Sequence, residues 1–147
     1  MTHAPSRLAQ LVEDQRIAML TTCQPDGELD ARPMSVLDLD ASGCFWFFTE
    51  HAPEDQAAHE RYRRVNLSFS DCGSATYVSI SGRGELSHAP DRIAALWTDA
   101  ARPWFPDGPE SPRLAVLKVT PQRSEFWDAP DSRIVRGAAL ASATLDA

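Results

Sequence analysis

Short apolar segments that end at turn signals run through most of this chain, and they constrain its fold more than any single motif. Residues 16–23 form a compact apolar segment that ends at Pro25-Asp26-Gly27, and residues 28–39 end at Asp40-Ala41-Ser42-Gly43. Proline, aspartate, serine and glycine in such clusters favour tight turns between strands. The pattern therefore predicts an antiparallel meander. Further strands are expected at residues 44–49, 65–69, 75–86 and 114–127.

Short helices are expected beside these strands. Apolar residues recur at helical spacing in residues 8–12, and Pro90 begins a second amphipathic segment. Pro53 suits a first helical position and two acids follow it, so we expect a helix from there to about Tyr62. Many strands with few helices predict a mainly β fold, a closed antiparallel barrel with helices packed outside it.

The size and charge of the chain exclude several classes of protein. Its 147 residues suffice for one domain. The net charge of -7 and the single lysine, Lys118, oppose nucleic-acid binding, which needs many basic groups. No apolar run approaches the ~20 residues of a membrane helix, and residues 1–12 lack the apolar stretch of a signal peptide. We therefore expect a cytoplasmic protein without nucleic-acid or membrane partners.

Two segments on neighbouring predicted strands carry the residues of greatest chemical interest. They are Arg32-Pro33-Met34-Ser35 and Trp46-Phe47-Phe48-Thr49. Proline in a strand marks an edge or a bulge, where a ligand can reach free backbone groups. A guanidinium and a hydroxyl suit a phosphate, and the aromatic run suits a flat ring, so the segments suggest a phosphorylated aromatic cofactor. The alternatives are a surface arginine on an edge strand and plain core packing of the aromatic residues.

Several short stretches, taken in order, extend this pattern over about residues 8–128. They are Ile17-Ala18-Met19-Leu20-Thr21-Thr22, Pro25-Asp26-Gly27, Arg32-Pro33-Met34, Trp46-Phe47-Phe48-Thr49, Val65-Asn66-Leu67-Ser68-Phe69, Ser79-Ile80-Ser81-Gly82, Trp104-Phe105-Pro106 and Glu125-Phe126-Trp127-Asp128. The combination resembles the FMN-binding split barrels of the pyridoxamine 5'-phosphate oxidase-like superfamily, and within it the general stress protein family. The resemblance implies an antiparallel split β-barrel, FMN as cofactor with FAD as an alternative, and a homodimer with flavin sites at the subunit interface.

The resemblance also implies roles for residues of the two strand segments. Arg32 would contact the FMN phosphate, and Pro33 and Met34 would lie against the ring and offer backbone groups to its polar edge. Phe48 and Thr49 match an aromatic-threonine pair that approaches the flavin, with Thr49 donating near the ribityl phosphate. Core packing of Phe48 and a strand-end cap at Thr49 are the alternatives.

Two tryptophans complete the expected cofactor site. Trp127 matches a tryptophan that approaches the flavin across the dimer interface, with core packing as its alternative. Trp104 lies in a loop held by proline and glycine, where covering the ring and anchoring the loop are equally good interpretations. Tyr77 aligns with a glutamine that reaches the ring from the partner subunit, but interface packing explains it equally well, and we leave it out of the site.

The chain departs from the oxidases at the phosphate end of the site. Where they have Ser-Arg-Lys and use the last two on the phosphate, this chain has Pro53-Glu54-Asp55. The site has therefore lost two positive charges and gained two negative ones. Arg61 or Arg64, further along the same predicted helix, are candidates to compensate.

A second departure concerns the substrate end. Residues 133–137 read Arg-Ile-Val-Arg-Gly where the oxidases read Arg-Leu-His-Asp-Arg, so pyridoxamine phosphate oxidation is not expected. The sequence predicts a flavin-binding domain at residues 1–128 and a loosely ordered C-terminal tail at 129–147. The hypothesis is a flavin-dependent oxidoreductase of unknown substrate and unknown catalytic residues, without a metal site. A non-enzymatic flavin carrier or sensor, and a flavin-free structural dimer, are the rival hypotheses.

Overall fold

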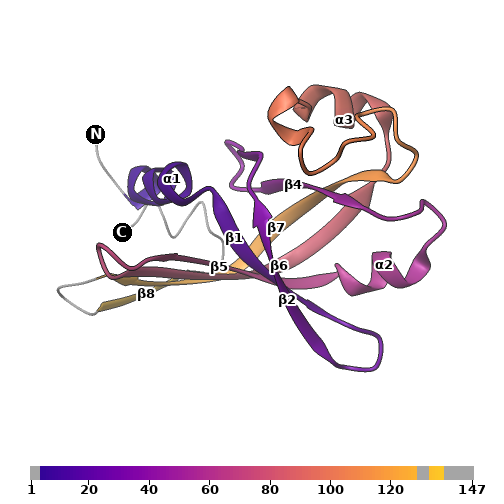
Figure 1. The fold of residues 1–147 in the computed structure, drawn as a ribbon. Coiled ribbons are helices and arrows are strands. Elements are labelled where there is room, and N and C mark those ends of the chain that lie inside the picture. Colours follow the sequence, from indigo (N-terminus) through magenta and orange to yellow (C-terminus); the bar gives the residue numbers. More distant parts are fainter. Residues whose placement is uncertain (1–3, 129–132, 138–147) are drawn as a thin grey trace.

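The predicted strands join into one curved antiparallel sheet (Figure 1). A computed structural model describes residues 4–128 and 133–137. The strand order is β2-β1-β5-β6-β7-β4-β3, β8 pairs with β7, and every pairing is antiparallel. The prediction of a mainly β antiparallel fold is confirmed. The predicted meander is wrong, because β2 pairs with β1 and not with β4, which pairs with β3 and β7. The strands are β1 (Ile17–Cys23), β2 (Leu29–Ser35), β3 (Asp38–Leu39), β4 (Phe45–Glu50), β5 (Arg64–Asp71), β6 (Thr76–Ser87), β7 (Leu114–Asp128) and β8 (Arg133–Gly137).

Alternating burial along the strands separates a core face from an outer face. In β1, Ala18 and Leu20 are fully buried, whereas Ile17 and Met19 are exposed. The buried side chains pack with helix α1 (Ala4–Gln15), which contributes Leu8, and each large apolar side chain so buried contributes about 1.5–3 kcal/mol. The larger fully buried members of this core include Phe45, Phe47, Phe69, Leu67, Ile80 and Leu117.

Strand β4 is covered on both of its faces, as its aromatic residues predict. Phe45 and Phe47 belong to the main core. Phe48 belongs to a second cluster with Ile93 of helix α3 (Pro90–Leu96), and Trp46 packs against that cluster. Figure 1 shows α3 lying over the part of the sheet that contains β4 and β7.

Helix α2 begins later than the sequence predicts. It spans Gln56–Arg61, and Asp55 caps its N-terminus, because the Asp55 carboxylate accepts a hydrogen bond from the Ala58 amide at 3.1 Å. The prediction that Pro53 begins the helix is therefore wrong. Proline followed by acids suits a turn as well as a first helical turn, and here the stronger cap at Asp55 sets the boundary.

Close approach between Gly84 and the end of α2 joins this helix to the sheet. A Cβ atom at Gly84 would overlap the Tyr62 carbonyl oxygen, and the Gly84 amide donates to the Arg63 carbonyl at 3.3 Å. Glycine at this position therefore lets the chain after α2 lie directly on β6.

The predicted C-terminal tail falls partly beyond the residues that the structure describes. Of the tail predicted at residues 129–147, residues 133–137 form β8 on β7, and the remainder lies outside the described residues. Among the helices that are described, none is long and apolar enough to cross a membrane.

Candidate functional site

Arg32 lies on an edge strand of the sheet. Among the described strands β2 pairs with β1 alone, with Arg32 opposite Leu20, so the other edge of β2 keeps its backbone groups unpaired in the ladder. Pro33 is exposed and Met34 is half-buried against the core. The sequence-based expectation of an edge strand at Pro33 is confirmed. The curved sheet also brings β2 into contact with β4, the strand that carries Thr49.

Thr49 belongs to a buried hydrogen-bonded group at the end of β4. The Thr49 Oγ1 atom lies 3.3 Å from the Tyr62 hydroxyl, and this hydroxyl lies 3.1 Å from His51 Nε2. Tyr62 is fully buried, Thr49 is 5% exposed, and the His51 side chain is 12% exposed. Because a buried polar group without a partner is costly, these three side chains hold one another in place.

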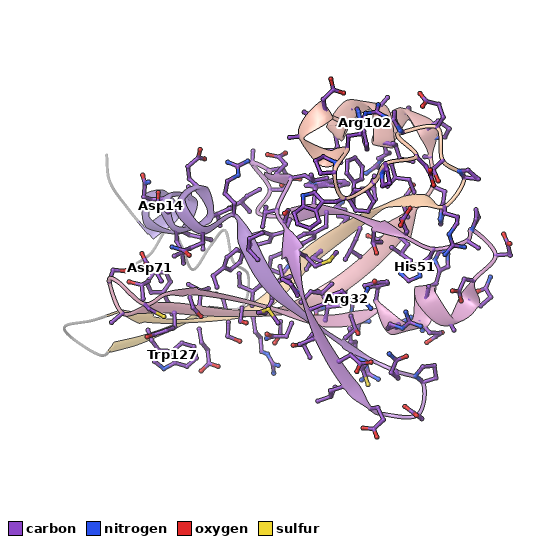
Figure 2. All side chains as sticks on the ribbon, in the orientation of Figure 1. Asp14, Arg32, His51, Asp71, Arg102 and Trp127 are labelled. Carbon is purple, nitrogen blue, oxygen red and sulfur yellow. The ribbon has the colours of Figure 1, made fainter. Side chains whose placement is uncertain are left out.

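The positive charges of three arginines act on His51. Burial lowers the pKa of His51, and the charges of Arg61, Arg32 and Arg113 lower it further, while Asp55 opposes them. Figure 2 shows Arg32 and His51 at the end of the sheet where α2 lies. Among the described residues, none of the three guanidinium groups forms an ion pair. We call the following residues the His51 cluster: Arg32, Thr49, His51, Arg61, Tyr62 and Arg113.

Asp55 has a structural role that its place in the family pattern does not suggest. Its carboxylate caps α2, and its Oδ2 atom lies 3.9 Å from His51 Nδ1. The carboxylate therefore faces the His51 cluster, where it offsets part of the positive charge of the arginines.

Of the two arginines considered as replacements for the missing charges, Arg61 faces the cluster and Arg64 does not. Arg61 is half-buried, and its Nε donates to Gln24 Oε1 at 3.1 Å. Contrary to expectation, Arg64 is not on the helix but is the first residue of β5; it lies opposite Arg83 on β6 and lines a cavity of about 470 Å³.

Of the two aromatic candidates, Phe48 packs in the cluster under α3 and Trp104 lies in the loop after α3. Phe48 is 4% exposed, and its ring packs against those of Trp97 and Phe105 at centroid distances of 5.7 and 5.9 Å. Its side chain thus points to the opposite face of β4 from the main core. Trp104, beside Phe105, is 72% exposed.

Trp127 lies on the outer face of the sheet. It is directly opposite Tyr77 on β6 and is half-buried. Figure 2 shows Trp127 toward the β8 end of the sheet and Arg32 toward the α2 end. One chain therefore does not bring these two predicted site residues together. The role predicted for Trp127, a contact from the other subunit, stays a prediction.

Sequence reasoning misses His51, Tyr62 and Arg113. His51 is two residues after Thr49 and belongs to no metal motif; among the described residues no group that could hold a metal is found. The sequence marks Tyr62 only as a helix end, and Arg113 precedes β7 in a loop. These residues meet through tertiary packing, for which the sequence offers no spacing rule.

The donors of the His51 cluster fit a phosphate group. Guanidinium groups and a hydroxyl are strong partners for phosphate oxygens, and the free edge of β2 offers backbone groups beside them. Thr22, on the same face of the β1–β2 ladder as Arg32, has a buried hydroxyl with no hydrogen-bond partner among the described residues.

Known structures share this fold. A protein related to general stress protein 26, from Clostridium acetobutylicum, has a TM-score of 0.78 at 21% identity, over 93% of this chain and 94% of that one. A general stress FMN/FAD binding protein from Xanthomonas citri has a TM-score of 0.66 at 29% identity, over 83% of this chain and 86% of that one. These similarities confirm the predicted split barrel.

Sequence comparisons agree with the structural ones. Iron uptake protein A2 of a Synechocystis strain is 29% identical over 112 residues, which cover 67% of this chain and 32% of the relative. The chain thus matches about a third of that protein's length. The model of the family described as pyridoxamine 5'-phosphate oxidase like matches residues 3–147. This chain therefore belongs to the pyridoxamine 5'-phosphate oxidase-like family.

Proposed function

We propose that this protein binds FMN, with the phosphate at the His51 cluster and the ring along the free edge of β2 beside Pro33 and Met34. The observation that carries the proposal is electrostatic: the largely buried imidazole of His51 lies in the positive field of three arginines, Arg61, Arg32 and Arg113, which form no ion pair with any described residue, while Asp55 offsets only part of this field. Such an excess of positive charge is unfavourable in the free protein and is relieved by an anion. A structurally similar protein from Nostoc punctiforme is described as FMN binding, and the Xanthomonas citri protein as FMN/FAD binding, which supports a flavin.

A comparison of FMN with riboflavin tests the phosphate role of Arg32. Charge-assisted hydrogen bonds contribute roughly 1.5–3 kcal/mol, so Arg32→Ala should weaken FMN binding about 10- to 150-fold and riboflavin binding much less. Arg63→Ala is the matched control, because Arg63 is exposed and pairs with Glu60 at 2.9 Å. Equal losses for both ligands would show that the substitution disturbs the fold and not a phosphate contact.

A homodimer with shared flavin sites is part of the proposal. Ile17, Met19, Leu29 and Tyr77 are large apolar side chains that stay exposed, and together with Trp127 they lie on the outer face of the sheet. An apolar face of this kind supports an interface with a second copy. Light scattering at micromolar concentration should give a dimer mass. A monomer that still binds flavin would refute the shared site.

The proposed chemistry is electron or hydride exchange, which a bound flavin supplies while the protein provides orientation and electrostatics. The substrate is unassigned. Residues 133–137 lack the histidine and acid of the oxidases, which favours the alternative of a non-enzymatic flavin carrier or sensor. Turnover with NAD(P)H that bleaches the flavin band would support the oxidoreductase, and stable colour without turnover would support the carrier.

The spectrum of the purified protein tests the proposal as a whole. A flavin band is expected, and mass analysis of the released cofactor distinguishes FMN from FAD. A colourless protein that binds neither FMN nor FAD would leave the flavin-free structural dimer as the better hypothesis. A cytoplasmic location is also proposed, from the sequence and its unpaired cysteines.

A further inference from the structure

We propose that His51 takes up one proton when a phosphate group binds, so that the site acquires a positive charge only when it is occupied. The inference rests on the proposed function, because it concerns the site that we assign to the FMN phosphate. The proton comes from solvent and forms an N–H bond on the imidazole, which becomes an imidazolium.

The hydrogen bonds around Tyr62 can run in two directions. The chain from His51 Nε2 through the Tyr62 hydroxyl to Thr49 Oγ1 has links of 3.1 and 3.3 Å, and a neutral imidazole permits either direction. In one direction, the Tyr62 hydroxyl donates to His51 Nε2, and the Thr49 hydroxyl donates its hydrogen to the Tyr62 oxygen. In the other direction, His51 Nε2 donates to the Tyr62 oxygen, and the Tyr62 hydroxyl donates to Thr49 Oγ1. The Thr49 hydroxyl hydrogen is then free to bind another acceptor.

Protonation selects the second direction. Both nitrogens of an imidazolium carry hydrogens, so Nε2 can then only donate. Thr49 is left with a free hydroxyl hydrogen for an anion, in the role of phosphate donor that the family resemblance implies for it. A protonated His51 thus prepares Thr49 as well as adding charge to the site.

The charges around His51 favour proton uptake once an anion is bound. Four charged groups act on His51: Arg61 of α2, Asp55 at the cap of α2, Arg32 of β2 and Arg113 in the loop before β7. The ring of Tyr62 contacts the His51 ring. His88 Nε2 lies 2.7 Å from the backbone carbonyl oxygen of His51, and the His88 ring lies 6.4 Å from that of His59. In the free protein, burial and the arginines keep the pKa of His51 below its ordinary value. A phosphate dianion at these arginines reverses the local potential and raises that pKa.

Proton uptake measured by calorimetry tests the inference. FMN is titrated into the wild-type protein at pH 7.5 in two buffers of different ionisation enthalpy. The phosphate of FMN is already mostly dianionic there, because its second pKa is about 6. We expect an uptake of about half to one proton per FMN. The FMN association constant should then fall by up to about tenfold per pH unit as the pH rises from 7 to 8.5.

Three comparisons assign the proton to His51 and its uptake to the phosphate. Riboflavin lacks the phosphate, and its binding should take up no proton. His51→Gln should abolish the uptake with FMN, whereas His59→Gln should retain it, because His59 is half-buried on α2 and stands outside the cluster. If His51→Gln fails to fold, the wild-type proton count with FMN and riboflavin still decides the question.

The titrations distinguish failure of the proton-uptake inference from failure of the proposed FMN site. FMN binding without proton uptake, or an equal uptake in His51→Gln, overturns the inference and leaves the flavin site standing. FMN that fails to bind at every pH overturns both.

Discussion

Removing one hydroxyl group, in Tyr62→Phe, tests the structure of the His51 cluster directly. The ring keeps its place in the core, but Thr49 and His51 each lose their partner on this oxygen. A hydrogen bond of this kind contributes about 0.5–1.5 kcal/mol, so the two together predict a loss of about 1–3 kcal/mol in the free energy of unfolding. The low exposure of Thr49 and His51 favours the upper half of this range, because water cannot easily replace the lost partner.

Urea unfolding at pH 8 and one fixed protein concentration measures this loss, since a dimer would make stability depend on concentration. The chain offers a matched control in its other tyrosine, Tyr77, which is 40% exposed. Tyr77→Phe should change stability by no more than about 0.5 kcal/mol. An unchanged m-value in both variants would show that the unfolding reaction itself is the same.

A double-mutant cycle isolates one of the two bonds. Thr49→Val combined with Tyr62→Phe should show a coupling of about 0.5–1.5 kcal/mol, because each single change removes the same interaction. If Tyr62→Phe costs no more than Tyr77→Phe, or if the coupling is zero, Tyr62 does not join Thr49 to His51. Protonation of His51 could not then prepare Thr49 for a phosphate.

The same region of the molecule is open to three more tests. Gly84→Ala should destabilise the fold by several kcal/mol in urea, because its Cβ would overlap the Tyr62 carbonyl oxygen, whereas Gly73→Ala should cost little. Folding lowers the pKa of His51, so below about pH 6.5 the unfolded chain binds more protons than the folded protein does. The free energy of unfolding should therefore fall as the pH drops below about 6.5. The variant His51→Gln should show a weaker pH dependence. Asp55→Lys should lose the α2 cap, at about 0.5–2 kcal/mol, while Asp55→Asn keeps a capping oxygen and removes the charge. Asp55→Asn should therefore tighten FMN binding at low salt with little loss of stability; unchanged FMN affinity would show that the carboxylate does not act on the phosphate site.

The sequence predicts the individual strands and turns well because their signals are local, whereas the order of the strands in the sheet, which depends on distant pairings, differs from the predicted meander. Pro25-Asp26-Gly27 and Asp40-Ala41-Ser42-Gly43 form the turns expected of them, and Gly27 and Gly43 adopt φ angles of +92° and +88° that glycine accommodates easily. The predicted start of α2 is wrong because two local signals, at Pro53 and Asp55, compete within three residues.

The site is less accessible to such reasoning because its residues come from separate elements. Arg32 and Thr49 can be recognised in the sequence, because a proline follows Arg32 and an aromatic run precedes Thr49. The curvature of the sheet brings their strands, β2 and β4, into contact. His51, Tyr62 and Arg113 carry no local pattern, since a histidine in a loop and a tyrosine after a helix are compatible with many environments. Their association depends on how the chain directly after α2 meets β6, which Gly84 permits and which no periodicity in the sequence encodes.

The double covering of β4 has a consequence for how a ligand would be bound. A strand between two packed clusters has little freedom to shift, because any displacement disturbs Phe47 in one cluster and Phe48 in the other. Thr49 follows these residues directly, so its conformational entropy is lost when the chain folds and not when a ligand arrives. Substitutions that loosen the packing of α3 should therefore weaken ligand binding without touching the ligand, by making the position of Thr49 less well defined.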